Sequence, residues 1–267
     1  MFQRIISAVV ALMIVVPILI WGGVSGVQIL VGAALLVVLY EFAPVASPDH
    51  SLSAFVCSSL VGLGLYSWMA VLPVDTGFVA AVVLGVAVLL TWAMFVHKEP
   101  LDGAVAGAIA ALSVPYLAIA LGFIGWVRGF SAEGLTWIFF VLISTWAADT
   151  GAYFAGRFFG KRKLFERISP KKTWEGVWGG LALSTIIAVC WALTDPFIPV
   201  AHAAALGALL AASGVVGDLI ESMFKRARGI KDSGGIMPGH GGLFDRVDSL
   251  LFTMPVAWAY ATFFGLA

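Results

Sequence analysis

The chain has 267 residues, of which 61% are hydrophobic and only 11% are charged, and its 15 basic and 15 acidic residues leave no net charge. Soluble domains hold about 45–50% apolar and about 25% charged residues, so this composition excludes an ordinary soluble protein. The mean hydropathy of +1.02 favours a membrane protein instead.

Apolar runs long enough to cross a bilayer recur along the whole chain. A run of about 18 residues or more without charge is typical of a transmembrane helix. The first run follows Arg4 and resembles a signal peptide, but no small-residue cleavage site follows it, which favours a retained helix. The sequence therefore predicts an all-α polytopic membrane protein of about nine helices, near residues 5–22, 24–41, 53–73, 77–96, 104–126, 135–156, 176–194, 202–220 and 249–266.

Basic residues set the expected orientation, because Lys and Arg gather in cytoplasmic loops. If nine helices alternate from a cytoplasmic N-terminus, every Lys and Arg except Arg128 falls on the cytoplasmic side. The polar segments 157–175 and 221–248 then share that side. The zero net charge hides a strongly basic cytoplasmic face, which suits an anionic ligand.

Charged residues are unevenly divided along the chain. The first half is nearly bare of charge, whereas the second half holds almost all the polar groups. We therefore expect an N-terminal transmembrane scaffold of five helices over 1–130 and a catalytic transmembrane region over 131–267. The charge-poor half could offer a surface to lipid or to a second copy in a homodimer. Cys57 and Cys190 lie inside predicted spans, and we expect both to be buried free thiols.

The most informative segment runs from Ser222 to Asp248. It combines cations suited to phosphate, carboxylates suited to a divalent metal, and glycines that allow close backbone approach. Transfer at phosphorus depends mainly on positioning and electrostatics, so these residue types together indicate metal-assisted phosphate chemistry. The residues concerned are Lys225, Arg226, Arg228, Lys231, Asp232, His240, Gly241, Gly242, Asp245, Arg246 and Asp248.

Helical spacing groups some polar residues before this segment. Asp218, Ser222 and Lys225 follow at about one-turn intervals, so one helix face carries an acid, a hydroxyl and an amine, and Glu221 flanks it. Asp218 is a candidate metal ligand, and a structural Asp218–Lys225 pair is the alternative. Asp149 lies inside an apolar span, where a carboxylate costs about 2.5–3.5 kcal/mol. It should therefore face the protein interior or a water-filled cavity, either as part of the site or as an interhelical hydrogen bond.

Two further groups have both a functional and a structural explanation. Lys171 and Lys172 stand in a predicted turn directly before a helix, whose N-terminus itself favours an anion. Lys163 and its basic neighbours fit topology and lipid headgroups equally well. Asp245 and Asp248 are three residues apart at the start of the last helix, where capping alone would favour an acid.

Taken together, these residues resemble the signature of the phosphatidate cytidylyltransferases, also called CDP-diacylglycerol synthases. The resemblance covers residues 145–250 in detail, and Met237 departs mildly from the family's usual residue. The first 130 residues match only in general character. The matching run is Ser222-x-x-Lys225-Arg226-x4-Lys231-Asp232-x-Gly234, then Pro238-x-His240-Gly241-Gly242-x-x-Asp245-Arg246-x-Asp248.

The resemblance implies an Mg²⁺-dependent nucleotidyltransferase, with K⁺ as a further cation. It would transfer the CMP moiety of CTP or dCTP to phosphatidic acid and give CDP-diacylglycerol and pyrophosphate. The implied metal ligands are Asp218, Asp245, Asp248 and Asp149, and the implied catalytic residues are Asp218, Asp245, Asp248, Lys225 and His240. The implied phosphate-binding residues are Lys171, Lys172, Lys225, Arg226, Lys231, Arg246, Gly241 and Gly242.

Two other functions remain open at this point. A CTP-dependent lipid kinase of the polyprenol type would release CDP rather than pyrophosphate. An anion transporter would use Asp149 and Asp218 as coupling acids, but transporters usually show internal repeats, which this lopsided chain lacks. The expected home is a bacterial cytoplasmic membrane, with the active site on the cytoplasmic side and no nucleic-acid partner.

Overall fold

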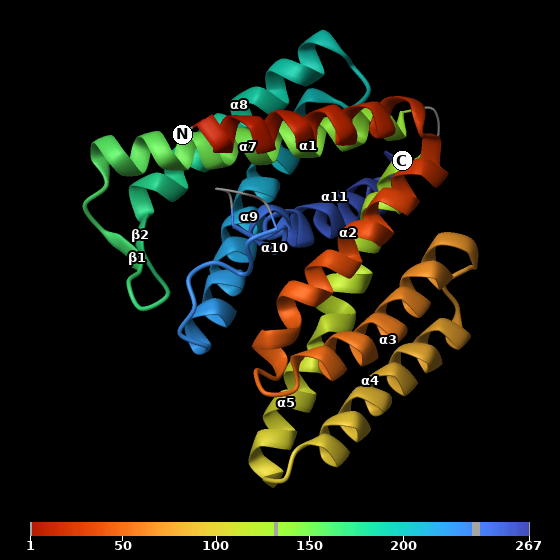
Figure 1. Ribbon diagram of the computed structural model, residues 1–267. Coiled ribbons are helices and arrows are strands. Elements are labelled where there is room, and N and C mark those ends of the chain that lie inside the picture. The colour runs from red at the N-terminus through yellow and green to blue at the C-terminus, as the bar shows by residue number, and fades with distance from the viewer. Residues whose placement is uncertain (1, 131–132, 237–240, 267) are drawn as a thin grey trace. The chain divides into compact units, whose positions relative to one another are not determined.

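The computed structural model describes residues 2–130, 133–236 and 241–266 (Figure 1). Its helices pack into two units. The first unit comprises Met1–Gly125 and Asp232–Arg246, and the second comprises Trp126–Lys231 and Val247–Ala267. A segment of the signature region, Asp232–Arg246, therefore packs with the N-terminal helices although it lies late in the sequence.

Seven described helical runs are long and apolar enough to cross a membrane, which confirms a polytopic, largely helical membrane protein. α1 (Phe2–Trp21) and α11 (Leu250–Phe263) lie where the first and last spans were predicted, but α11 has only 14 residues. The count of nine spans and the cytoplasmic N-terminus stay predictions. The seven runs are α2 (Gly23–Ala46), α3 (Ser51–Val71), α4 (Thr76–Val96), the continuous α5 (Pro100–Ser113), η1 (Val114–Ile119) and α6 (Ala120–Arg128), then α7 (Gly134–Phe159), α8 (Trp174–Thr194) and α9 (Val200–Ala227).

The first unit is built around α2, which packs against α3 and α5, while α4 packs against α3 and α5 (Figure 1). Between α5 and α6 the helix widens into the π-helix η1. Pro115 falls within η1 and has no N–H to donate, which interrupts the α-helical ladder there. Val114 and Leu117 of η1 are fully buried, so the π-helical turn belongs to the core of this unit.

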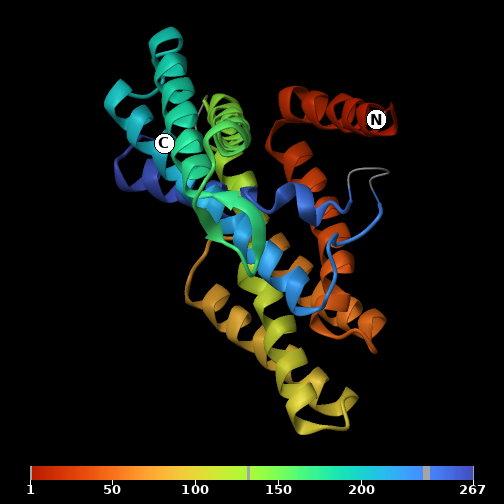
Figure 2. The same ribbon diagram turned by 90° about the vertical axis from the view of Figure 1, so that its left-hand side faces the viewer.

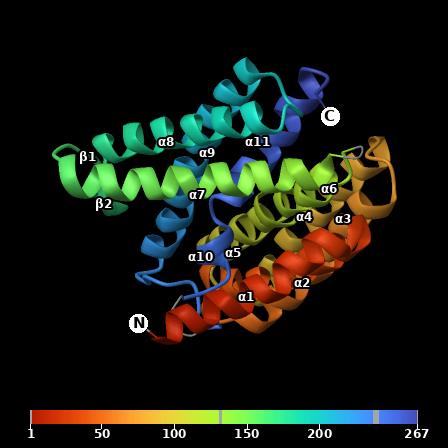
Figure 3. The ribbon, with the colours of Figure 1, turned by 90° about the horizontal axis from the view of Figure 1, so that it is seen from above.

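The second unit is built on a close pair of helices, α7 and α8, which run side by side (Figure 3). Small residues line their contact, as is common where membrane helices approach closely. A Cβ atom at Gly180 would lie 2.8 Å from the backbone oxygen of Ala148, so only glycine allows this separation. α9 packs against α8, and α11 packs against α9.

A short antiparallel hairpin joins α7 to α8 (Figure 2). Its strands are β1 (Lys163–Phe165) and β2 (Ser169–Thr173), with a register shift between the two pairs of opposed residues. The prediction of a turn before the helix is wrong, because residues 169–173 are paired as a strand. A helix follows directly, as predicted, but α8 begins at Trp174, two residues before the predicted start. The Thr173 hydroxyl caps it by accepting a 3.2 Å hydrogen bond from the amide of Gly176.

Candidate active site

One face of α9 carries the polar residues that the sequence grouped. The Ser222 hydroxyl donates to Oδ1 of Asp218 over 3.3 Å. Nζ of Lys225 lies 2.7 Å from Oε2 of Glu221, and both side chains are almost completely buried. A buried ion pair loses its hydration and needs close geometry to offset that loss. Lys225 therefore forms a buried ion pair with Glu221, one turn away on the same helix.

The hairpin contributes a second cation. Nζ of Lys172, on β2, lies 2.7 Å from Oδ2 of Asp218, and both side chains remain partly exposed. Successive residues of a strand point to opposite faces. Lys171, its neighbour, is accordingly exposed. Of the two lysines predicted to bind phosphate, the structure brings Lys172 to the acids of α9.

The segment before α11 supplies a third acid, Asp248. Gly217 of α9 permits the approach, because a Cβ atom there would lie 2.6 Å from the backbone oxygen of Asp248. Carboxylate oxygens of Asp218, Glu221 and Asp248 all lie within 4.8 Å of one another. Asp149 of α7 is exposed, yet its carboxylate interacts electrostatically with Asp218 and Lys172. The second unit thus gathers four acids and two lysines.

This donor set fits a hard divalent cation. Mg²⁺ binds oxygen ligands and usually takes one or two carboxylates together with substrate phosphates. Asp218 and Asp248 are two of the predicted ligands, and Glu221 joins them. The sequence placed Glu221 beside the polar helix face without naming it a ligand. Its spacing of three residues from Asp218 was the signal that would have identified it.

The carboxyl of Asp248 is a weaker acid than usual. Burial, together with the negative charge of Asp218, raises the pKa of its carboxyl to about 7, although the hydrogen bond that the Ser249 amide donates opposes the rise. Two neighbouring carboxylates that repel each other are a common feature of sites that take a cation or a proton.

Metal binding at this cluster should therefore depend on pH. Below about pH 7 the Asp248 carboxyl is protonated and neutral, so a cation must displace the proton before it binds. We expect the apparent Mg²⁺ affinity to fall about tenfold for each pH unit below 7 and to level off above it. Isothermal titration at pH 6 and pH 8 measures this change. Asp248→Asn should flatten the dependence, and an unchanged slope in that variant would assign it to another group.

Asp245 belongs to the first unit, where its carboxylate links the two described parts of the signature loop, residues 232–236 and 241–244. Its Oδ2 accepts hydrogen bonds from the amides of Ser233, over 3.1 Å, and Gly242, over 2.8 Å. Gly241 has a φ of +84°, a left-handed conformation that favours glycine. The amide of Gly242, predicted to approach a ligand oxyanion, here approaches the Asp245 carboxylate. A metal-binding role for Asp245 stays a prediction.

The remaining residues predicted to bind phosphate lie at the end of α9 and in the signature loop. Arg226 donates from its guanidinium to the carbonyl oxygen of Ile230 over 2.7 Å, which closes the end of α9. Lys231 and Arg246 are exposed. Their predicted contacts with phosphate stay predictions. His240 and Met237 lie outside the described residues.

The sequence reasoning missed Glu41. This glutamate lies in α2, is only 3% exposed, and accepts hydrogen bonds from the signature loop. The sequence did contain a signal for it: Glu41 is an acid within a span whose mean hydropathy is 2.2. An acid in such a span needs polar partners, which makes it a candidate functional residue.

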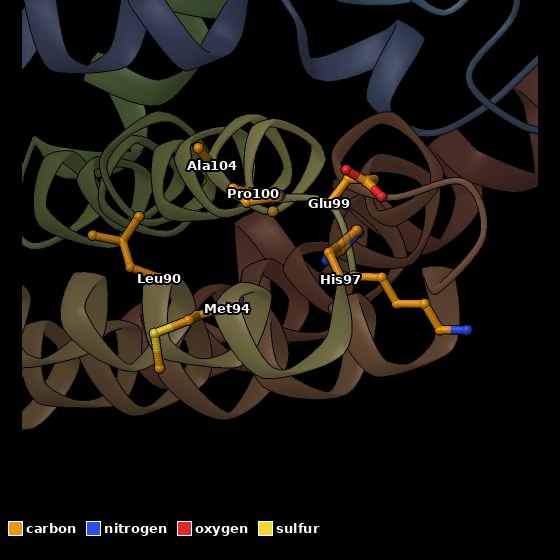
Figure 4. A pocket seen from close by; sticks show the side chains of 8 residues that line it. Leu90, Met94, His97, Glu99, Pro100 and Ala104 are labelled. Carbon is orange, nitrogen blue, oxygen red and sulfur yellow. The ribbon is translucent and has the colours of Figure 1, made fainter.

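A cavity of about 320 Å³ lies in the first unit, where α4 turns into α5 (Figure 4). Leu90 and Met94 of α4 and Ala104 of α5 form its apolar lining. His97, at its edge, lies 3.0 Å from the hydroxyl of Ser47. Among the predicted site residues that the structure describes, none lines this cavity.

Comparison with known proteins decides the family. The model of the cytidylyltransferase family matches residues 2–264, almost the whole chain. The chain belongs to the cytidylyltransferase family. The predicted family is thereby confirmed, and the match includes the first 130 residues, where the signature gave no guidance.

Several bacterial relatives of this cytidylyltransferase are named phosphatidate cytidylyltransferase. The protein of Bacillus subtilis is 34% identical over 274 aligned positions, covering 99% of both chains. That of Staphylococcus epidermidis is 33% identical over 258 positions, covering 95% of this chain and 96% of the relative. That of Pseudomonas aeruginosa is 50% identical over 127 positions, covering 47% of this chain and 46% of the relative.

Proposed function

We propose that this cytidylyltransferase transfers the CMP moiety of CTP or dCTP to phosphatidic acid, giving CDP-diacylglycerol and pyrophosphate. The family match and the names of relatives that align over nearly the whole chain support this activity. The observation that carries it is the meeting of Lys172 with the carboxylates of Asp218, Glu221 and Asp248. Cations for phosphate and acids for a metal are the two parts that the reaction requires.

The chemistry needs no enzyme nucleophile. An oxygen of the lipid phosphate forms a bond to the α-phosphorus of CTP. The bond between that phosphorus and the oxygen that bridges the α- and β-phosphates breaks, and pyrophosphate leaves with this oxygen. A phosphate monoester has its second pKa near 6, about one unit below neutral pH, so its oxygen attacks without a strong base. Lys172 is placed to neutralise charge on the phosphates, and Lys225 is held beside Glu221 for the same task.

Mg²⁺ is the proposed cofactor, held by Asp218, Glu221 and Asp248, with Asp149 adding negative charge nearby. When bound, it would neutralise phosphate charge and orient the leaving pyrophosphate. Asp245 is proposed as a further ligand, and K⁺ as a second cation.

The proposed location is a bacterial cytoplasmic membrane, with the site on the cytoplasmic side. The membrane-spanning helices and the bacterial relatives support a multi-pass membrane enzyme. The concentration of basic residues around the hairpin supports the cytoplasmic side. A homodimer through the charge-poor helices is also proposed, and light scattering of the purified protein in detergent would test it.

Pyrophosphate release tests the proposed function directly. Purified protein in detergent is given CTP, Mg²⁺ and phosphatidic acid, and each is omitted in turn. We expect release only when all three are present. CDP formation from a lipid alcohol without pyrophosphate would instead identify a CTP-dependent lipid kinase, and no turnover of CTP with any lipid would contradict both.

A further inference from the structure

The N-terminal helices place a carboxylate, that of Glu41, inside the first unit next to the signature loop. Glu41 lies near the C-terminal end of α2 and is 3% exposed. A charged group in such a place is expensive unless donors surround it. An acid kept there requires specific partners, and the structure supplies them from a segment about 200 residues later in the chain.

The partners are neutral donors of the loop. The amide of Phe244 donates to Oε2 of Glu41 over 2.8 Å, and the amide of Leu243 donates to Oε1 over 3.1 Å. The hydroxyl of Ser233 donates to Oε2 over 3.4 Å. Both carboxylate oxygens are thus used, and they bind the loop at its two ends. In Figure 3 the segment that enters α10 (Phe244–Val247) lies beside α2.

Two glycines of the signature make this contact possible. A Cβ atom at Gly242 would lie 2.5 Å from Oε2 of Glu41, and one at Gly234 would lie 2.6 Å from Oε1. Real Cβ atoms do not approach oxygen so closely, so any side chain at either position would displace the loop or the carboxylate. These glycines therefore allow the loop backbone to approach Glu41.

Aromatic packing holds the same point of the loop. The ring of Phe244 is fully buried and meets Phe42 edge to face, with ring centroids 5.7 Å apart. It also meets Tyr116 of η1, with centroids 6.1 Å apart. Such edge contacts contribute about 0.5–1.5 kcal/mol beyond the buried area. The residue directly before Asp245 is thus anchored by hydrogen bonds and by packing.

We propose that Glu41 is a positioning residue for the cytidylyltransfer reaction. By binding Ser233, Leu243 and Phe244, it holds the loop in the conformation that presents Asp245 and Arg246 for their proposed roles. The first helices are then part of the catalytic apparatus as well as a membrane anchor. The expected effect on turnover rests on the proposed function, whereas the contacts between Glu41 and the loop do not depend on it.

Glu41→Gln separates positioning from mere stability. Glutamine has the same shape, but its amide nitrogen is a donor and would face an N–H or O–H donor of the loop. If Glu41 only stabilised the fold, the melting temperature and turnover would fall together, because the glutamine amide leaves a buried hydrogen bond of the loop unmade. Positioning predicts a fall in kcat of about 10- to 100-fold, as expected when hydrogen bonds to a charged group are lost.

The experiment measures three quantities on wild type, Glu41→Gln and the control Glu99→Gln, which changes an exposed glutamate of the same unit. They are melting temperature in detergent, kcat and KM for pyrophosphate release with CTP and phosphatidic acid, and amide exchange of peptides covering residues 241–246 and α8. We expect Glu41→Gln to lower kcat with KM for CTP changed less than about threefold. Amide exchange at Leu243 and Phe244 should become faster, while α8 and the melting temperature stay as in wild type.

Other results overturn the inference. Wild-type kcat in Glu41→Gln would show that the loop does not need this carboxylate, whatever its amide exchange. A lower kcat with unchanged exchange at Leu243 and Phe244 would show that Glu41 does not act through the loop. A melting temperature that falls in step with activity would assign it a structural role. If wild type releases no pyrophosphate, the proposed function fails, but the exchange arm still decides whether Glu41 holds the loop.

Discussion

Asp218→Asn is expected to reduce pyrophosphate release by at least about 1,000-fold, because a catalytic metal supplies several kcal/mol of stabilisation and each 1.36 kcal/mol is tenfold in rate. Asp218 contacts Lys172 and Ser222 and shares the carboxylate cluster with Glu221 and Asp248. Asparagine keeps the shape of the side chain but removes the charge that a cation and Lys172 both use. The measurement is initial-rate pyrophosphate release at saturating Mg²⁺, with membrane insertion and melting temperature checked in parallel.

The matched control is Asp195→Asn, which changes an exposed acid of the same unit at the end of α8. It should retain wild-type activity.

Asp245→Asn, like Asp218→Asn, should abolish turnover, since the Asp245 carboxylate binds the Ser233 and Gly242 amides and is a proposed metal ligand. Full activity in both Asp218→Asn and Asp245→Asn would remove the proposed metal site.

Lys172→Ala is expected to lower kcat/KM for CTP about 100-fold, the usual effect of losing one group that stabilises developing charge. In the structure its amine lies 2.7 Å from Asp218, so it competes with a cation for that carboxylate. Removing the amine should therefore leave the half-saturating Mg²⁺ concentration unchanged or lower, even as turnover falls. Steady-state kinetics with Mg²⁺ and CTP varied independently measures both effects.

Lys163→Ala is the control for charge on the same hairpin. Lys163 is exposed, and its amine donates to the carbonyl oxygen of Pro170 over 2.6 Å. It should change kcat/KM by less than about threefold, in line with an exposed surface charge. Equal losses in both variants would mean that the hairpin acts through its total charge, and the specific role of Lys172 would be wrong.

Local pattern predicted much of this molecule. Long apolar runs gave helices close to their observed positions, because crossing a bilayer demands length and hydrophobicity. The spacing of Asp218, Ser222 and Lys225 gave the polar face of α9, because helical periodicity acts within a few residues. Both cysteines are free thiols, as expected, but the prediction that both are buried is wrong: Cys57 is half-buried and Cys190 is exposed.

Contacts between distant parts of the chain were beyond such reasoning. Nothing in the sequence spacing of Lys172 and Asp218 indicates that a strand brings them together. The hairpin is rich in basic residues and lacks the alternation of apolar and polar residues that would predict its two strands. Glu41 illustrates the same limit: its sequence neighbours show an acid in an apolar helix, but its partners lie in a loop more than 190 residues away. Only folding in three dimensions identifies them.

The bond between Glu41 and Phe244 has a consequence for biosynthesis. The two residues are 203 positions apart, and ribosomes add about 5–20 residues per second, so α2 is complete about 10–40 seconds before its partner amide exists. During that interval α3 to α9 are synthesised, while the carboxylate of Glu41 lacks its loop donors. The first unit can therefore close only near the end of translation, and any factor that shields this acid in the nascent chain would act within that window.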